Sequence, residues 1–224
     1  MRYLIANWKS TKNVEDAFSW VVQFNHLLKK ESSIQKKLNN DELKIIICPS
    51  FHLLTTVKAK IAKSKNIAIG AQDVSFFEQG NYTGEVSAQN LKNIINYSII
   101  GHSERRKYLK ETDNMIDQKI SILKDYSIEP ILCIRDNKDL IPKEVRFIAY
   151  EPIYAIGTGK NESLTEILNA KAKINHDRDT IFIYGGSVIP DNITEYSNSP
   201  EIQGFLVGNA SKDPNSFIMI ASRL

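Results

Sequence analysis

The stretch FIAYEPIYAIGTGK, residues 147–160, joins a short apolar run to one carboxylate and then to a segment with two glycines. The apolar run predicts a buried strand, which ends at Glu151. Pro152 biases Glu151 towards an extended conformation and away from a helical one. The segment after it, with Gly157 and Gly159, is typical of a loop that offers backbone N–H groups. An ordinary turn between a strand and a helix explains the same residues.

Outward from this stretch, short apolar runs alternate with segments of helical periodicity along the whole chain. This alternation predicts an α/β fold with a parallel sheet. The number and length of the strands favour one closed (β/α)8 barrel domain over residues 1–224, with its site on the loops that follow the strands. An open doubly wound sheet is the competitor, but no G-x-G-x-x-G turn follows the first strand. We expect strands at 3–6, 43–48, 67–71, 97–100, 129–133, 145–150, 180–184 and 204–207.

Three local patterns give expectations for the helices. In the helix over 14–28, the spacing places Phe18, Val21, Val22 and Leu28 on one buried face. Ser50 is expected to cap the helix over 51–62. Residues 29–41 are polar and either extend the first helix or form a loop. Further helices are expected at 87–93, 113–124, 164–174 and 214–222.

Composition limits the class of protein. The chain has 224 residues, a formal net charge of +3 and 42% hydrophobic residues, which are ordinary values for a globular protein. Without a run of five or six basic residues, binding to nucleic acid or to a membrane surface is not expected. Cys48 and Cys133 end apolar runs and are expected to be buried thiols, so neither a disulfide framework nor a metal site is predicted. Without a signal-peptide pattern or a spanning apolar segment, a cytoplasmic location is expected.

Polar residues follow several of the predicted strands at the same end of the barrel. Asn7 and Lys9 follow the first strand, His102 the fourth and Glu151 the sixth. Glycine-containing turns follow the last three strands, where barrels commonly bind phosphate through backbone N–H groups. The pattern therefore predicts a cation, an imidazole and a carboxylate beside an anion site, without a metal. Taken singly, each of these side chains has an ordinary structural explanation.

Six motifs, in order along nearly the whole chain, resemble those of the triosephosphate isomerase family. They are Asn7-Trp8-Lys9, GHSERR at 101–106, AYEP at 149–152, AIGTGK at 155–160, YGGSV at 184–188 and GFLVG at 204–208.

The resemblance implies a (β/α)8 barrel enzyme that interconverts dihydroxyacetone phosphate and D-glyceraldehyde 3-phosphate through an enediol(ate), in glycolysis and gluconeogenesis, without a cofactor. Glu151 is then the base that takes the carbon-bound proton, and His102 polarises the carbonyl. Asn7 and Lys9 face the substrate oxygens. The phosphate is expected on Gly157, Ser187, Gly208 and Asn209, under a loop of residues 153–160 that closes against Tyr184 and Ser187.

The resemblance also implies a homodimer. In the family, the loop after the third strand docks into a second subunit, and residues 79–85 match that loop. Thr83 lies near its tip and is expected to support Asn7 and Glu104 of the other subunit.

The sequence departs from the family pattern at several positions. The segment between Cys133 and Val145 is too short for the family's helix, so that helix is expected to be shortened or missing. Tyr154 stands in place of a tryptophan at the loop hinge. Asn209 replaces a glycine, whose backbone dihedrals it must accept.

Two other functions fit parts of the pattern. An aldolase would use Lys9 as a Schiff base, which borohydride with substrate would trap as a mass increase on Lys9. A non-catalytic phosphosugar-binding barrel would bind the ligand without exchanging its carbon-bound hydrogen in heavy water. An isomerase shows exchange and no trapped adduct.

Overall fold

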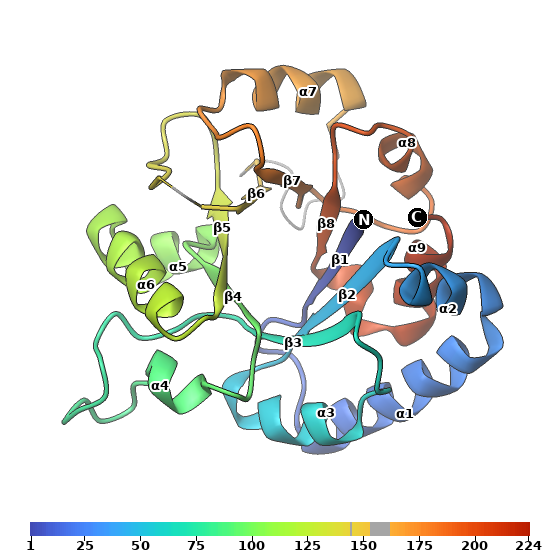
Figure 1. The fold of residues 1–224 in the computed structure, drawn as a ribbon, viewed down its shortest axis with the longest axis horizontal. Helices are drawn as coiled ribbons and strands as arrows, with labels where there is room; N and C mark the ends of the chain where they lie inside the picture. The colour runs from blue at the N-terminus through green and yellow to red at the C-terminus, as the bar shows by residue number, and fades with distance from the viewer. Residues whose placement is uncertain (144, 153–161) are drawn as a thin grey trace.

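A computed structural model describes residues 1–143, 145–152 and 162–224. Its parallel strands pair in chain order and close into a barrel, with β1 paired to both β2 and β8 (Figure 1). The predicted barrel is thereby confirmed over the open sheet. The strands are β1 (Arg2–Asn7), β2 (Leu43–Cys48), β3 (Ile67–Ala71), β4 (Tyr97–Ile100), β5 (Glu129–Ile134), β6 (Phe147–Tyr150), β7 (Ile181–Tyr184) and β8 (Gly204–Val207).

The strands point alternate side chains into the barrel and towards the surrounding helices, as a pleated strand must. Tyr3 and Ile5 of β1 and Phe147 and Ala149 of β6 belong to the inner cluster. That cluster also holds both cysteines, each at most 1% exposed, which confirms the expectation that they are buried. The residues between them, such as Leu4, belong to the outer core against the helices.

Helices and short turns surround the barrel, as Figure 1 shows. On one side, α1 packs against α9 through aromatic rings: Trp20 and Phe24 of α1 stack with their centroids 4.9 Å apart, and the Phe217 ring of α9 lies tilted at 6.0 Å from Trp20. The helices are α1 (Val14–Lys30), α2 (Ser32–Asn39), α3 (Leu54–Lys60), α4 (Ala88–Leu91), α5 (Ser103–Tyr108), α6 (Asp113–Asp125), α7 (Leu164–Lys173), α8 (Ile193–Ser197) and α9 (Pro214–Ser222), with 3-10 turns η1 (Phe51–Leu53) and η2 (Asn209–Lys212).

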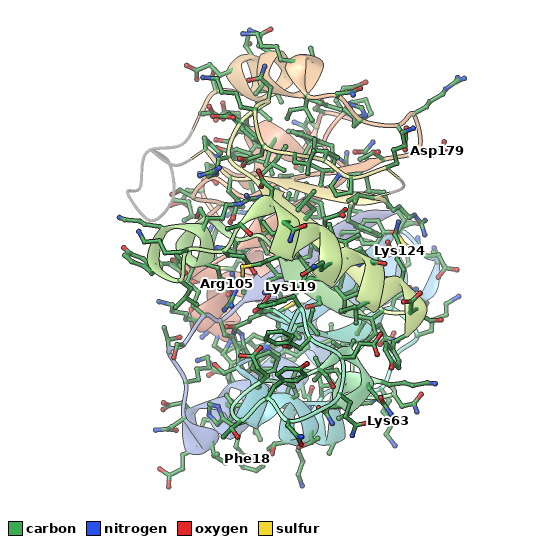
Figure 2. The ribbon with its side chains drawn as sticks, turned by 90° about the vertical axis from the view of Figure 1, so that its left-hand side faces the viewer. Phe18, Lys63, Arg105, Lys119, Lys124 and Asp179 are labelled. Atoms are coloured by element: carbon green, nitrogen blue, oxygen red, sulfur yellow. The ribbon has the colours of Figure 1, made fainter. Side chains whose placement is uncertain are left out.

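The predicted buried face of α1 is partly wrong. Val21 and Leu28 are buried, but Phe18 and Val22 are 48% and 52% exposed. Phe18 lies at the edge of the molecule in Figure 2. The buried face includes Trp20 instead, because that ring packs between Trp8 and Phe217 of α9.

Two further local predictions are corrected. Residues 51–62 begin as the turn η1 before α3, and the Ser50 side chain makes no capping bond there. Its hydroxyl instead donates to the Lys9 carbonyl at 3.0 Å, so a tertiary contact replaces the expected cap. The polar segment after α1 forms the separate helix α2, because Ile34 and Leu38 bury one side of it.

The segment between β5 and β6 forms turns, with no helix among its described residues 135–143 and 145–146. Asp139 closes the first turn by accepting the backbone N–H of Arg135 at 2.7 Å. Ile141 and Val145 pack against the outer core in place of a helix. How far this segment is shortened relative to the family stays a prediction. Across the described chain, no helix is both long and apolar enough to cross a membrane.

The aromatic contact between α1 and α9 gives a test of the core. Phe217→Ala is expected to lower the free energy of unfolding by about 3–5 kcal/mol, because it leaves a cavity beside Trp20. Met219→Ala on the same helix is the control: this side chain is 45% exposed, and a loss within about 0.5 kcal/mol is expected. Urea unfolding measures both variants, and equal losses would contradict this account of the packing.

Candidate functional site

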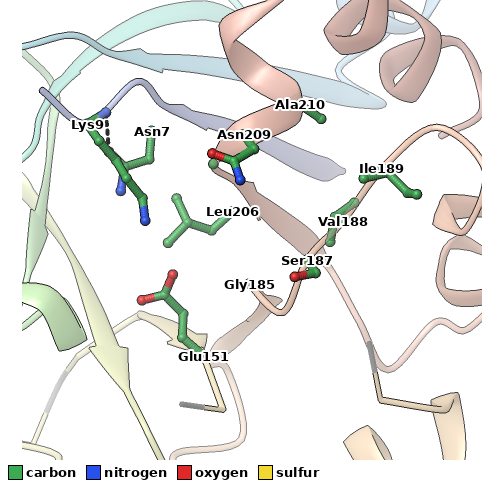
Figure 3. A pocket seen from close by; sticks show the side chains of 11 residues that line it. Asn7, Lys9, Glu151, Gly185, Ser187, Val188, Ile189, Leu206, Asn209 and Ala210 are labelled. Carbon is green, nitrogen blue, oxygen red and sulfur yellow. Dashed lines mark hydrogen bonds between the residues drawn. The ribbon is translucent and has the colours of Figure 1, made fainter. Parts of the chain in front are cut away.

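The inward-facing positions of the strands continue into the site. Two residues beyond Ile5 comes Asn7, and two residues beyond Ala149 comes Glu151, so the strand period of two points both side chains into the mouth of the barrel. Gly185 and Gly208 follow Ile183 and Leu206 in the same way. A cavity of about 120 Å³ lies there (Figure 3), lined by Asn7, Lys9, Glu151, Gly185, Ser187, Val188, Ile189, Leu206, Gly208, Asn209 and Ala210.

Glu151 is held at the end of β6 with 4% of its surface exposed. Its backbone N–H donates to the Ile134 carbonyl at 2.8 Å, which continues the ladder to β5. Its side chain packs on Gly185, where an added Cβ would lie 2.6 Å from the Glu151 Cγ. Burial, and then the charge and hydrogen bond of Glu151, raise the pKa of the Cys133 thiol, which therefore stays protonated beside the carboxylate.

His102 follows β4 and begins α5, with 4% of its surface exposed. Its Nδ1 accepts the backbone N–H of Glu104 at 3.2 Å, so in the neutral ring the proton lies on Nε2. Nε2 lies 3.4 Å from Glu151 Oε2. Burial lowers the pKa of His102, but the charge and hydrogen bonding of Glu151 and the charge of Glu104 raise it, and the net shift is upward.

Lys9 lies on the turn after β1 with a φ of 52°, in the left-handed region. Its backbone N–H donates to Asn7 Oδ1 at 3.1 Å, and its ammonium pairs with Glu104. In Figure 3, Lys9 and Glu151 extend into the same space, with Ser187 and Asn209 across from them. A second cavity of about 430 Å³ adjoins the first and shares Asn7 and Lys9 with it, and His102 and Glu104 line that second cavity.

The turn after β7 and the start of η2 form the other side of the smaller cavity. Ser187 has a φ of 54°, and its carbonyl accepts from Asn192 Nδ2 at 3.0 Å. Asn209 begins η2 directly after Gly208, and its φ is not positive, so the glycine that it replaces is not required for its backbone. Backbone N–H groups at the start of a helical turn are suited to an anion.

The structure therefore brings together Asn7, Lys9, His102, Glu151, Ser187, Gly208 and Asn209, although their strands are far apart in the sequence. Gly157, Tyr154 and the loop expected to close over the site lie outside the described residues. Tyr184 is fully buried and its hydroxyl accepts the Glu162 N–H at 3.2 Å. Among the residues that the structure describes, no group of His, Cys, Asp and Glu is arranged to hold a metal ion.

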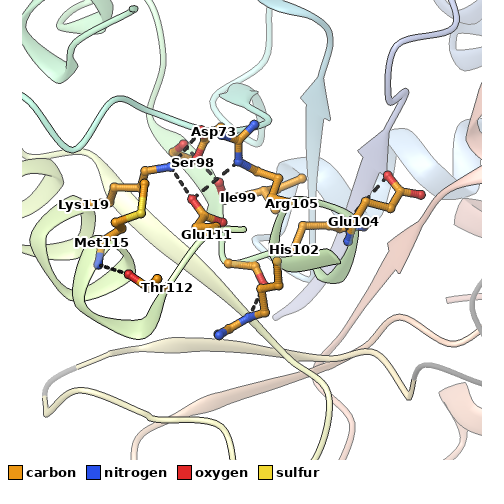
Figure 4. Close-up of polar contacts among 12 residues, drawn as sticks. Asp73, Ser98, Ile99, His102, Glu104, Arg105, Glu111, Thr112, Met115 and Lys119 are labelled. Carbon is orange, nitrogen blue, oxygen red and sulfur yellow. Dashed lines mark hydrogen bonds and ion pairs between the residues drawn. The ribbon is translucent and has the colours of Figure 1, made fainter. Parts of the chain in front are cut away.

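Sequence reasoning missed a buried charge cluster next to this site (Figure 4), formed by Asp73, Arg105, Glu111 and Lys119. Lys119 Nζ donates to both Asp73 oxygens at 2.7 and 2.9 Å and also pairs with Glu111. Arg105 Nη2 lies 2.7 Å from Asp73 Oδ2. Burial raises the pKa of Asp73 to about 6, although Lys119 and Arg105 lower it. The cluster ties the loop after β3 to α5 and α6. An apolar pattern on α6 gives no signal for a buried lysine.

Comparison with known proteins gives one consistent result. The family model described as Triosephosphate isomerase matches residues 2–224. A protein from Mycoplasma genitalium is 39% identical over 98% of this chain and 97% of its own length. Proteins from Dictyoglomus thermophilum and Mycoplasma pneumoniae are each 36% identical, over 96% and 98% of this chain and 96% and 97% of their own lengths. All three relatives are named triosephosphate isomerase.

The raised pKa of Asp73 predicts a pH-dependent contribution to stability. In the folded protein the Asp73 carboxyl has a pKa of about 6, whereas the ordinary pKa of an aspartate side chain is 3.8. The contribution of Asp73 is therefore fully present below the ordinary value and is lost as the pH rises through about 6. Relative to Asp73→Asn, the wild type should gain about 2 kcal/mol in the free energy of unfolding between about pH 7.5 and about pH 4.5.

Urea unfolding at the two pH values measures this difference. Asp191→Asn is the control, because that side chain is 89% exposed, and its difference from the wild type should stay constant. A constant difference for Asp73→Asn as well would show that its carboxyl is not held protonated by burial.

Proposed function

The chain belongs to the triosephosphate isomerase family, and from that premise we infer how its side chains divide the reaction. The enzyme interconverts dihydroxyacetone phosphate and D-glyceraldehyde 3-phosphate, a step of glycolysis and gluconeogenesis that passes through an enediol(ate). Such a step needs a base for a carbon-bound proton, an acid for the carbonyl oxygen and fixed positive charge near the developing oxyanion.

Glu151 is the base and His102 is the acid in this proposal. The observation that carries it is the contact of 3.4 Å between Glu151 Oε2 and His102 Nε2, both buried at the mouth of the barrel. Because the Glu104 N–H occupies Nδ1, the neutral imidazole directs its only N–H towards the space beside Glu151. A substrate bound there lies beside a proton acceptor, the Glu151 carboxylate, and a proton donor, the Nε2–H group of His102. Substrate that separates the two groups removes the contact that raises the pKa of His102, which favours the neutral ring.

Lys9 and Asn7 supply the electrostatic part of the reaction. Both line the cavity that contains Glu151, and the Lys9 Cε lies 3.6 Å from the place of a Cβ on Gly208. An anion held by Ser187, Gly208 and Asn209 would therefore lie near the Lys9 ammonium. Fixed charges in a buried site stabilise developing charge more strongly than they would in water. Gly157 completes the phosphate site in the proposal.

A homodimer and a cytoplasmic location belong to the same proposal, as does one domain over residues 1–224. Three apolar side chains beside the larger cavity are strongly exposed: Phe51, Tyr108 and Leu109, at 39%, 67% and 61%. The loop after β3 extends away from the barrel in Figure 1. Within it, Tyr82 stacks on Phe77 at 4.1 Å, while Thr83 next to it is exposed. In this proposal the protruding loop of one copy docks into the exposed apolar groove of the second copy, which contains Asn7 and Glu104.

The assignment of the base is tested by Glu151→Asp, which shortens the side chain and withdraws its carboxylate. A displacement of about 1 Å costs about 100-fold, so kcat should fall by at least this factor while circular dichroism stays that of the wild type. A coupled assay with glyceraldehyde 3-phosphate measures the rate. Glu195→Asp on the exposed side of α8 is the control and should keep full activity. An undiminished rate in Glu151→Asp would exclude Glu151 as the base.

The dimer is tested by Thr83→Arg, which places a charged side chain at the tip of the loop. Sedimentation velocity should show the wild type at twice the chain mass and Thr83→Arg shifted towards the single chain, with reduced activity. Thr194→Arg on α8 is the matched control, since this residue is also exposed but lies far from the loop along the barrel. A monomeric wild type with full activity would contradict the dimer and leave the assignments of the catalytic side chains intact.

A further inference from the structure

We propose that Gln72 is a positioning residue for Lys9, holding its backbone so that the ammonium faces the substrate. Gln72 directly follows β3, 63 positions from Lys9 in the sequence. The proposal rests on the proposed function, because it assumes that Lys9 acts on the bound triose phosphate. No part of it requires Gln72 to contact the substrate.

The backbone of Lys9 needs support because its conformation is unfavourable. With a φ of 52°, Lys9 is in the left-handed region, where a side chain crowds the following carbonyl. Lysine has no short polar side chain that could stabilise this conformation locally, as asparagine does. Such conformations persist where surrounding contacts determine them, and they are frequent at functional sites.

Hydrogen bonds fix both sides of the Lys9 residue. On one side, its N–H donates to Asn7 Oδ1 at 3.1 Å. On the other side, its carbonyl accepts from Gln72 Nε2 at 2.9 Å and from the Ser50 hydroxyl at 3.0 Å. Two separate loops thus hold the same carbonyl oxygen.

The amide of Gln72 also joins three strand ends. Its Nε2 donates both to Lys9, after β1, and to the Cys48 carbonyl at the end of β2, each at 2.9 Å. Gln72 itself extends from the end of β3. The primary amide of Gln72 has two N–H groups, so this one side chain satisfies both carbonyls. A hydroxyl has one donor and a thioether has none, so neither would do the same.

The direction of the Lys9 side chain depends on this arrangement. Rotation of the backbone about φ or ψ would turn the Cα–Cβ bond and carry the ammonium away from Glu104 and from Gly208. Glu104 alone does not prevent this, because its side chain is 42% exposed and rotates on a flexible stem. The hydrogen-bonded carbonyl of Lys9 therefore sets the position of the Lys9 ammonium.

Gln72→Met tests the proposal, because methionine has a similar length and no N–H donor. We expect kcat/KM to fall about 10- to 100-fold, the scale of a small displacement of a group that acts on the substrate. Gln35→Met is the matched control: Gln35 Nε2 also donates to two carbonyls, of Leu28 and Lys29, at 3.0 and 2.9 Å. It should keep full activity.

A second measurement separates positioning from a general loss of structure. Inorganic phosphate is titrated into four proteins, the wild type, Gln72→Met, Lys9→Ala and the double variant, and binding is followed by phosphorus NMR. Gln72→Met should weaken phosphate binding several-fold when Lys9 is present and have no effect when Lys9 is alanine. An equal loss in both backgrounds would overturn the proposal, as would an unchanged kcat/KM in Gln72→Met.

Ser50→Ala provides a variant that keeps Gln72 in place and removes the other donor to the Lys9 carbonyl. It should show a smaller loss of kcat/KM and the same dependence on Lys9 in phosphate binding. If Gln72→Met does not fold, the Ser50→Ala result decides the proposal. A wild type without isomerase activity would contradict the proposed function, whereas an active wild type with unaffected Gln72 and Ser50 variants would contradict only the role of Gln72.

Discussion

The closed parallel barrel gives each strand a period of two, and the site depends on this constraint more than on any single contact. The side chains of Ile5 and Ala149 are packed inside the barrel, so the residues two positions further on, Asn7 and Glu151, must point into its mouth. A shift of one residue in either strand would place a polar side chain in the outer core against the helices. The packing of the interior therefore sets the direction of the residues that we propose to act on the substrate.

The short helix α5 connects the site with the rest of the structure. His102 begins it and accepts its backbone N–H group, Glu104 pairs with Lys9, and Arg105 pairs with Asp73 in the buried charge cluster. The contacts made by His102, Glu104 and Arg105 thus lie within little more than one helical turn. Because Lys119 of α6 holds both Asp73 and Glu111, that turn is tied to a buried network and is positioned by it.

Much of the fold was predictable from local patterns, and the exceptions have identifiable causes. The strands were placed to within a residue or two, because continuous apolar runs between turn residues leave few alternatives. The face predicted for α1 is partly wrong because an apolar residue type does not fix burial: Phe18 and Val22 are exposed, whereas Trp20 packs between Trp8 and Phe217 of α9. Ser50 has the right residue type for a cap, but its hydroxyl bonds to Lys9, which is distant in sequence.

The sequence by itself determined which residues we propose to carry the chemistry, because strand ends, a carboxylate before proline and glycine turns are local features that can be recognised along one chain. It also determined the barrel, through the alternation of strands and helices. Only the tertiary structure decided how these residues are held. The left-handed backbone of Lys9 is held by the amide of Gln72, which donates to its carbonyl, and the buried charge cluster joins Asp73 to Lys119. Both contacts connect residues that lie tens of positions apart in the sequence. Such contacts follow from closure of the barrel, which brings strand ends together, and no local pattern encodes them.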